Sequence, residues 1–400
     1  MRSESHSCCR THGKHTHGRA SSIIVALALG AFTLGMASYM TAGLLAPIGA
    51  SLQISLQAAA QLVTAFTLAY GLVSPVAVAL LPPHRQREVL TGALLILIAA
   101  NAASAMVDDY RLLLLLRAIA GTGAGVYLAL SISASAALLP AGQAGKGIAW
   151  IMGGMASGTV LGVPLSLWLA DLQGWRAAFW LTAALGAIAF IGLILKLPAL
   201  PASHPSSLRQ KMSLLTDRQT VKILAVSLLA AIASLGMYTF LAPFMRSMPF
   251  AGFSTVTLWL GIWGAGGICG SVLVGPLSTR FCATTLARLI MTLLTLSLAL
   301  LPVAAHLHLW LAAFPLFLWG AAGWALQVPQ NHALLDVRKR YGDGNLAVAL
   351  NESALYLGSA MGAIAGGLVV GADVSLWWLP VGAAAVAGSA LFVHWRSENR

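Results

Sequence analysis

Two charged side chains stand inside long apolar stretches of this sequence, where a charge is costly. Arg117 and Glu352 each lie about six or seven residues inside such a stretch, and a charge within a membrane must face protein or water. Glu352, if removed from bulk water, could take up and release a proton near neutral pH, which is the chemistry of a proton-coupled carrier. It could equally be an acid that reaches back to the nearby membrane surface. Arg117 stays charged at physiological pH, so it could bond carbonyl groups of a neighbouring helix or bias a carrier, but it cannot carry the proton.

The stretches around these residues have the composition and length of membrane-spanning helices. The chain has 400 residues, of which 58% are hydrophobic and 8% charged, whereas soluble proteins carry roughly 25% charged residues. The apolar runs reach about 20 residues, the length that crosses the hydrocarbon core, and show no strand-like alternation. We therefore expect an all-α membrane protein with twelve spans, at residues 22–50, 58–81, 89–107, 112–139, 148–170, 177–197, 221–244, 254–277, 287–305, 309–328, 345–370 and 375–394.

The positive charges predict how these spans are oriented. With twelve spans, nineteen Lys and Arg residues lie on the side that holds both termini, and three lie on the other side. Because Lys and Arg accumulate in cytoplasmic loops, we expect both termini in the cytoplasm of a bacterial inner membrane. The basic, proline-containing connection at 198–220 separates two six-helix halves, 21–197 and 221–395, with cytoplasmic tails at 1–20 and 396–400.

Several functional classes are not expected. The net charge of +12 does not indicate nucleic-acid binding, because the basic residues flank spans instead of forming one soluble face. The His and Cys residues of the tail could bind a metal, but their spacing matches no closed site, so we expect a basic tail with no metal or cofactor. The stretch from Gly142 to Lys146 lacks the first glycine and the hydroxyl residue of a phosphate loop. With no catalytic constellation either, we expect a protein that is not an enzyme and that uses an ion or substrate gradient.

Small residues recur every fourth position in the fifth span. Gly154, Gly158 and Gly162 form such a ridge, which lets two helix backbones approach closely. The ridge could serve ordinary packing, or it could provide contacts that slide as two halves rock. Pro164 follows directly and is expected to kink the helix, because proline removes a backbone hydrogen bond.

The order and spacing of these motifs resemble a known family. They are Gly43-Leu44-Leu45-Ala46-Pro47, Arg117-Ala118-Ile119-Ala120-Gly121-Thr122-Gly123-Ala124-Gly125, Gly158-Thr159-Val160-Leu161-Gly162-Val163-Pro164-Leu165, Gly174-Trp175-Arg176 and Asn351 with Leu357-Gly358. From about Ala26 to Val370 the chain is similar to a major facilitator superfamily permease of the twelve-helix drug/proton antiporter branch, in particular the arabinose-efflux-like (sugar efflux) permeases. The resemblance implies a coupling role for Arg117 and a conformational role for Gly158, Gly162 and Pro164. The sequence departs from the family pattern at Ser38, where several drug exporters carry an acid.

The resemblance also implies which helices line a central cavity, namely the first, fourth, seventh and tenth. The main substrate candidates on these helices, with Asn351 from the eleventh, are Ser38, Tyr39, Thr41, Tyr238, Gln327, Asn331 and Asn351. Further polar or aromatic residues on the same helices are Ser131, Ser133, Thr239, Trp319, Trp324, Gln330 and His332. Aromatic rings with a few hydroxyl and amide groups suit sugar-like or amphipathic molecules, although each residue alone could serve packing.

The expected function is secondary active transport across the membrane. The best-supported form is proton-coupled efflux of small organic molecules by alternating access of the two halves. An importer or uniporter of the same fold is the alternative, because the first span lacks an acid. The expected partners are a small-molecule substrate, protons and the lipid bilayer, with no nucleic acid, and we expect a monomer.

Overall fold

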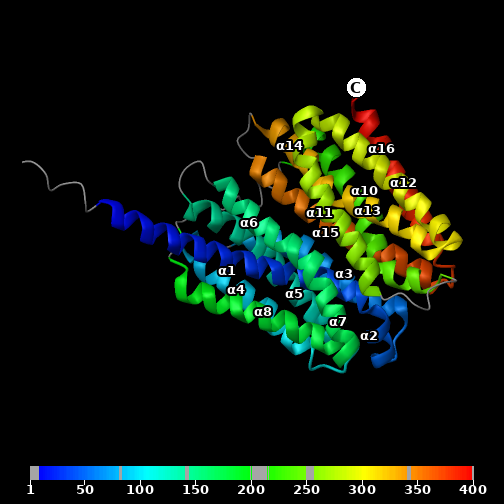
Figure 1. The fold of residues 1–400 in the computed structure, drawn as a ribbon, viewed down its shortest axis with the longest axis horizontal. Helices are drawn as coiled ribbons and strands as arrows, with labels where there is room; N and C mark the ends of the chain where they lie inside the picture. The colour runs from blue at the N-terminus through cyan, green and yellow to red at the C-terminus, as the bar shows by residue number, and fades with distance from the viewer. Residues whose placement is uncertain are drawn as a thin grey trace, which may run out of the picture.

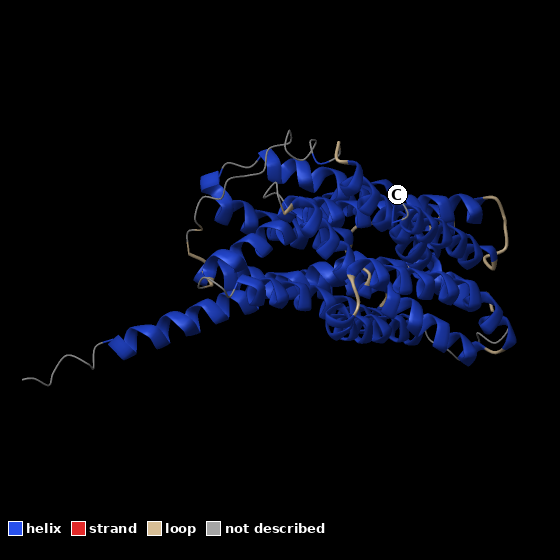
Figure 2. Ribbon diagram, turned by 90° about the horizontal axis from the view of Figure 1, so that it is seen from above, coloured by secondary structure: helices blue, strands red, loops and turns tan. Residues whose placement is uncertain are grey.

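The twelve expected spans appear as helices. The computed structural model describes residues 9–80, 83–139, 144–198, 200, 214, 216–248, 256–339 and 344–398. These residues contain twelve helical segments long and apolar enough to cross a membrane, and no strand is found among them (Figure 2). The all-α prediction is therefore confirmed. Residues 1–8 of the predicted tail and 201–213 of the predicted central loop lie outside the described residues.

The spans fall into two groups of six. The first group consists of α1 (Cys9–Gly43), α3 (Leu56–Leu80), α4 (Gln86–Ser104), α5 (Tyr110–Leu138), α6 (Ala144–Ser157) continued by η2 (Gly158–Gly162) and α7 (Val163–Gln173), and α8 (Trp175–Lys196). The second consists of α10 (Arg218–Arg246), α11 (Val256–Arg280), α12 (Ala283–Leu307), α13 (Ala313–Ala325) continued by α14 (Gln327–Arg338), α15 (Gly344–Gly371) and α16 (Trp378–Glu398). Three short helices, α2 (Leu45–Leu52), η1 (Pro83–Arg85) and η4 (Leu309–Ala312), join them.

Each group packs as a bundle, and the two bundles lie side by side (Figure 1). The second half meets the first mainly where α15 packs along α3, with further contacts between α10 and α1 and between α11 and α7. Helix α1 already begins at Cys9, within the predicted tail, and its first turns project beyond the bundle. The helix ends that carry Arg85, Lys146, Lys196 and Arg338 lie at one end of the molecule, called the basic end below; the opposite end is called the far end.

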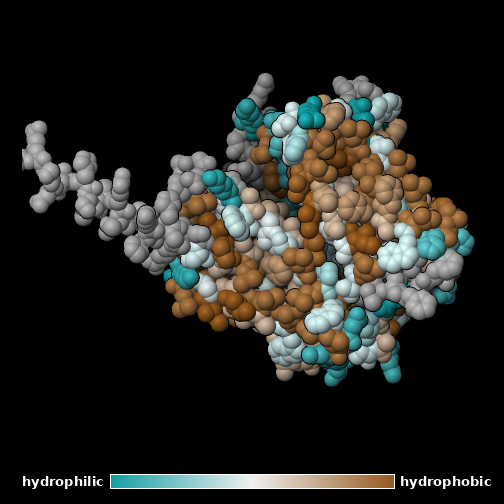
Figure 3. All heavy atoms as spheres, viewed as in Figure 1, coloured by the Kyte–Doolittle hydropathy of each residue, from teal (hydrophilic) through white to brown (hydrophobic). Residues whose placement is uncertain are grey.

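The outer surface of the bundles is apolar, as lipid contact requires. Large side chains such as Leu195, Trp168 and Leu300 are more than half exposed. Brown, apolar side chains cover the middle of the visible face in Figure 3, and the teal, polar ones gather towards its rims. Hydrocarbon would cover these apolar side chains, and the helices can lie in it because they satisfy their own backbone hydrogen bonds.

The fifth span is irregular where the sequence predicted a kink. Residues Gly158–Gly162 form a π-helical turn, in which the backbone N–H of Val163 donates to the carbonyl of Gly158. Pro164 follows and offers no N–H, while Ser166 Oγ donates to the carbonyl of Gly162 at 2.7 Å. Single π-helical turns of this kind occur often at functional sites.

The glycine ridge of this span lies directly against α1. A Cβ atom at Gly154 would overlap the carbonyl oxygen of Ala28, and one at Gly158 would overlap that of Phe32. These positions therefore admit only glycine unless the two helices separate. The ridge predicted from the spacing is thus a contact inside the first half.

Two expected span boundaries were wrong. The first span was expected to reach residue 50, but α1 ends at Gly43 and a turn at Leu44 starts the separate helix α2. The tenth span was expected to end at residue 328, but it continues to Arg338. A break at Leu326 places Pro329 near the start of α14, where its missing N–H does no harm. The polar residues after Leu326 differ in exposure: Gln330 is buried, whereas His332 and Asp336 are exposed.

Candidate substrate cavity and coupling residues

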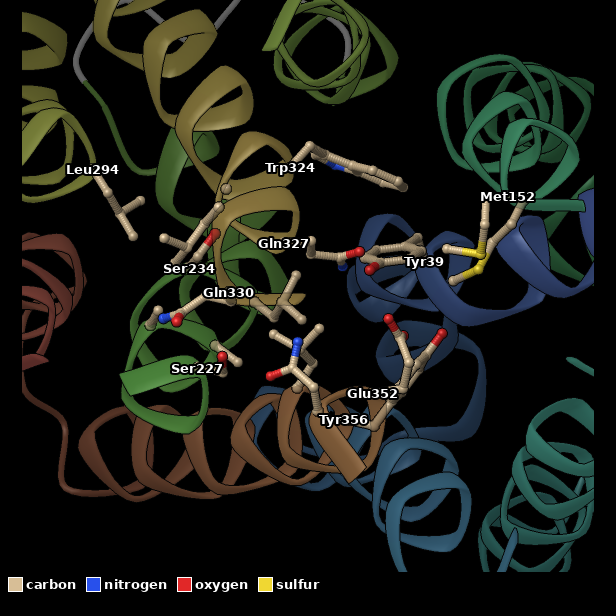
Figure 4. Close-up of a pocket in the computed structure, with 18 of the residues that line it drawn as sticks. Tyr39, Met152, Ser227, Ser234, Leu294, Trp324, Gln327, Gln330, Glu352 and Tyr356 are labelled. Carbon is tan, nitrogen blue, oxygen red and sulfur yellow. The ribbon is translucent and has the colours of Figure 1, made fainter. Parts of the chain in front are cut away.

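A cavity lies between the two halves, near the middle of the spans. Its empty volume is about 750 Å³, which includes space open to solvent. The first half contributes Tyr39 of α1 and Met152 and Met155 of α6. The second half contributes the remaining lining residues, from α10 to α15 (Figure 4). Polar groups therefore come mostly from one half, while the facing wall is largely made of methionine.

Glu352 extends into this cavity from α15. Its carboxyl group points towards Tyr39 and Met152, and Tyr356 stands one turn further along the same helix (Figure 4). Within the described residues, no hydrogen bond or ion pair engages this carboxyl. A carboxyl without a cationic partner, in a cavity of low polarity, can change its protonation state without breaking a salt bridge. Among the residues that line this cavity, Glu352 is the one with an acidic side chain.

Aromatic rings close the cavity at its far end. The ring of Tyr39 lies 5.3 Å from that of Tyr238, and Tyr238 lies 4.4 Å from Trp263, measured between centroids. Trp324 stands 6.4 Å from Tyr39, and Trp319 donates its indole N–H to Ser234 Oγ at 2.8 Å. Tyr39 belongs to the first half and the other rings to the second, so this aromatic cluster joins the halves.

The far end is closed by further contacts between the halves. Gly43 of α1 lies beside Leu260 of α11 and Leu167 of α7, and Gly371 of α15 lies against Gln57 of α3. All of these residues are close to the far ends of their helices. The structure is therefore closed on the side opposite the basic end.

Arg117 occupies a different site, inside the first half. It is fully buried, donates from Nη2 to the carbonyl of Ala37 at 2.8 Å, and places its guanidinium 4.4 Å from the ring centroid of Phe66. Phe179 stands on another side at 5.7 Å. Its Nε and Nη1 atoms have no hydrogen-bond partner among the described residues. The cation is thus held by one carbonyl and two aromatic faces, with no carboxylate beside it.

The substrate candidates divide between the cavity and its surroundings. Tyr39, Gln327 and Asn351 line the main cavity. Ser38 and Tyr238 line a smaller cavity beside it, which also includes Tyr39. Asn331 accepts a hydrogen bond from Asn351 at 2.9 Å, whereas Thr41 is buried and lines neither of these two cavities.

Of the five residues predicted to act in coupling, only Glu352 lines the cavity. Gly158, Gly162 and Pro164 lie in or next to the π-helical turn, and Gly162 packs on Met36 of α1. No hydrogen bond or ion pair joins Arg117 to Glu352 in the described part of the chain. A coupling role for these residues stays a prediction.

Sequence reasoning missed several lining residues. These are Met152, Met155, Ser227, Ser234, Trp263 and Tyr356. Helical spacing could have indicated two of them, since Tyr356 follows Glu352 by four residues and Ser234 follows Ser227 by seven, and residues at these spacings share a helix face. The methionines carry no such signal, because apolar residues dominate every span.

The family model for the Major Facilitator Superfamily matches residues 27–344. The chain belongs to this superfamily. Two solved transporters share the fold: the nucleoside transporter NupG, with a TM-score of 0.72 at 14% identity, over 94% of this chain and 98% of that one, and a bacterial homologue of the human lysosomal transporter Spinster, with a TM-score of 0.73 at 14% identity, over 94% and 96%. The chain is therefore a multi-pass membrane protein with the fold of a transporter.

The chain is also similar to curated proteins. The chain is 30% identical to the inner membrane transport protein YdhP of Escherichia coli (strain K12) over 377 residues, covering 94% of this chain and 96% of that protein. It is 29% identical to a chloramphenicol resistance protein of Streptomyces lividans over 265 residues, covering 65% and 68%. The expected superfamily is confirmed.

Proposed function

We propose that this protein is a secondary transporter that exports small organic molecules in exchange for protons. The observation that carries the proposal is Glu352, a carboxyl with no ionic partner among the described residues, facing a cavity between two halves of a transporter fold. A carrier of this kind binds its substrate in the middle of the membrane and opens alternately to the two sides as the halves rock. The name of YdhP supports transport across an inner membrane, and resistance to chloramphenicol, named for the Streptomyces relative, is an effect that export of a small organic molecule would produce.

The proposed arrangement places the basic end in the cytoplasm of a bacterial inner membrane, with both termini on that side. The nineteen Lys and Arg residues on this side support it. The moving units would be the halves 21–197 and 221–395. With the far end closed by the aromatic cluster, the structure corresponds to a carrier prepared to receive substrate from the cytoplasm.

Glu352 would couple the two fluxes because the carrier would hold a proton on this carboxyl and the substrate in the cavity alternately. A proton that enters from outside neutralises the carboxyl and favours return of the empty carrier, and loss of that proton to the cytoplasm prepares the cavity for substrate. Such a cycle uses the binding of one ligand to shift the populations that the other ligand finds. Arg117 would contribute a fixed positive charge inside the first half, without itself exchanging protons.

Proton movement in proteoliposomes tests the proposal. The purified protein is reconstituted with a pH-sensitive dye inside, and chloramphenicol, sugars and amphipathic drugs are added in turn. We expect a substrate-dependent proton flux that Glu352→Gln abolishes, because the amide cannot ionise. Ser353→Ala, at the neighbouring position, is the matched control and should retain the flux. Exchange of radiolabelled solute without proton flux would instead identify a uniporter.

A further inference from the structure

Three buried polar side chains line one side of the cavity without using all of their hydrogen-bonding groups. Ser227 of α10, Gln330 of α14 and Asn351 of α15 are at most 3% exposed and belong to the cavity lining. Ser227 Oγ, Gln330 Nε2 and Asn351 Oδ1 have no partner among the described residues. An unpaired polar atom in a protein interior costs about 1–3 kcal/mol. Three of them on three different helices therefore indicate a place that a ligand completes.

The geometry of this set is fixed by a neighbouring amide. Asn351 donates from Nδ2 to Asn331 Oδ1 at 2.9 Å, so its Oδ1 remains as an acceptor. Gln330 offers a donor through Nε2, and the hydroxyl of Ser227 can act in either sense. The set thus presents one donor, one acceptor and one adaptable group.

An apolar cluster covers this set on its side towards the basic end. Leu224 stands three residues before Ser227, Leu334 four residues after Gln330, and Ala347 four residues before Asn351, so each lies one turn nearer the basic end. These three residues form one buried cluster with Leu214. Beyond it, Arg338 and Asp217 form an ion pair at 3.7 Å between the end of α14 and the start of α10. In the described part of the chain, the set is therefore reached from the central cavity.

The set is also separated from the cavity's carboxyl. Asn351 and Glu352 are adjacent on α15, so their side chains leave the helix about 100° apart. In Figure 4, Ser227 and Gln330 lie on the side of Leu294, whereas Glu352 points the opposite way, towards Tyr39 and Met152. A charged ligand group placed among Ser227, Gln330 and Asn351 would lose its hydration with no opposite charge beside it, which is costly. A neutral hydroxyl or amide group would pair with all three without that cost.

We propose that Ser227, Gln330 and Asn351 form a polar pocket that binds an uncharged hydroxyl- or amide-bearing group of the transported molecule. The ring or apolar part of the same molecule then lies against Tyr39, Trp263 and Trp324. The substrate class is accordingly a neutral amphipathic molecule with hydrogen-bonding groups at one end. This inference rests on the proposed function, because it takes the cavity as the transport site.

Binding to the purified full-length protein tests the inference. The probes are chloramphenicol, uridine and phenyl β-D-glucoside, each beside its O-methylated derivative, together with tetraphenylphosphonium, a cation with no hydrogen-bonding group. Affinity is measured by calorimetry and by the shift in unfolding temperature. We expect at least one hydroxylated probe to bind more tightly than its O-methylated derivative. Ser227→Ala and Gln330→Met should each lower the affinity for that probe by about tenfold, the value of one hydrogen bond. The affinity for the O-methylated derivative should not change.

Thr64→Val is the matched control. Its hydroxyl is also buried and unpaired among the described residues, but Thr64 on α3 does not line the cavity, so binding should not change. The unfolding temperature of each empty variant shows that it is folded, and Ser227→Ala should not lower it, because the hydroxyl has no partner to lose. The inference is overturned if no hydroxylated probe binds, if O-methylation or the variants make no difference, or if tetraphenylphosphonium binds most tightly.

The same variants separate this inference from the proposed function. Ser227→Ala should raise the substrate concentration needed for half-maximal proton flux by about tenfold, the value of one hydrogen bond, whereas Glu352→Gln should abolish the flux at every substrate concentration. If the pocket variants discriminate between the probes while no proton moves in any variant, the polar pocket stands and the proton-coupled function fails. If protons move but the variants bind every probe as the wild type does, the polar pocket fails alone.

Discussion

The phenol rings of Tyr70 on α3 and Tyr356 on α15 stack across the boundary between the halves, with centroids 3.5 Å apart and planes inclined by 17°. The hydroxyl oxygen of Tyr356 also lies 3.4 Å from Ser38 Oγ on α1. Glu352 is one turn away on the same face of α15. A change at the cavity carboxyl is therefore one helical turn from a contact that holds the halves together.

Replacing Tyr356 should shift the balance between conformations. An aromatic pair contributes about 0.5–1.5 kcal/mol beyond its buried area, so Tyr356→Leu should lower the population of the present conformation by roughly two- to tenfold. Spin labels at Glu88 and Arg280, both exposed at the basic end, would report the distance distribution. Trp168→Leu, at a lipid-exposed aromatic on α7, is the control. An unchanged distribution in Tyr356→Leu would show that the stack does not favour either conformation.

Alanine substitutions in α6 and η2 should differ in their effect on stability, depending on whether the glycine contacts α1. Gly158→Ala should lower the unfolding temperature and transport, because its Cβ would overlap the carbonyl of Phe32 and force α1 away; overpacking of this kind costs about 1–3 kcal/mol. Gly153→Ala should have no such effect, since a Cβ at Gly153 meets nothing within 4 Å. Thermal unfolding of both variants in the same detergent makes the comparison. Equal stability of the two would contradict the close contact of α1 with η2.

Arg117 should show stability and transport changing in opposite directions. A buried cation with no carboxylate beside it is costly, so Arg117→Met, of similar length, should unfold at the wild-type temperature or above. Transport should nevertheless fall, because the fixed charge inside the first half is lost. Arg117→Lys keeps the charge but not the planar group that contacts Phe66 and Ala37. Wild-type transport by Arg117→Met would exclude a role for the charge in coupling.

The fold could be predicted almost completely from the sequence, because the membrane imposes one strong rule. Runs of apolar residues of sufficient length must be helices, and the charges between them separate the spans. The errors lie at two boundaries that apolar composition does not mark. Residues 45–50 are mostly apolar, like the first span, yet they belong to the separate helix α2. The tenth span was expected to end at residue 328, whereas its helix continues to Arg338 and brings Gln330 to the cavity and Asn331 to Asn351.

The site could be predicted only in part, because some of its lining residues are set by how helices pack. Glu352 and Tyr39 are conspicuous in apolar surroundings, and both line the cavity. Ser227 is one of several serines in the spans, and only the packing of α10 against α14 and α15 distinguishes it from those that bond their own helix, such as Ser166. Met152 becomes a lining residue through the way two bundles meet, which hydrophobic periodicity does not encode.

The orientation can be decided with a cysteine at the basic end. Cys282 lies between α11 and α12, outside the spans, and is exposed. The hydroxyls of Thr284 and Thr285, 3.2 and 3.1 Å from its Sγ, stabilise the thiolate and lower the pKa of Cys282 to about 7. Since the thiolate is the reactive form, its labelling rate should rise with pH and level off above about 7, one to two units earlier than for an ordinary thiol.

A membrane-impermeant maleimide then reports the side on which Cys282 lies. In a Cys8→Ser, Cys9→Ser background, the reagent should label inside-out vesicles at neutral pH and leave intact spheroplasts unlabelled, because the basic end is expected in the cytoplasm. Cys282→Ser controls for Cys269, which lies within α11. Thr284→Val with Thr285→Val should move the pH at which labelling levels off upwards, since the thiolate loses both hydroxyl contacts. Labelling of spheroplasts would reverse the orientation, and with it the direction in which the present conformation opens.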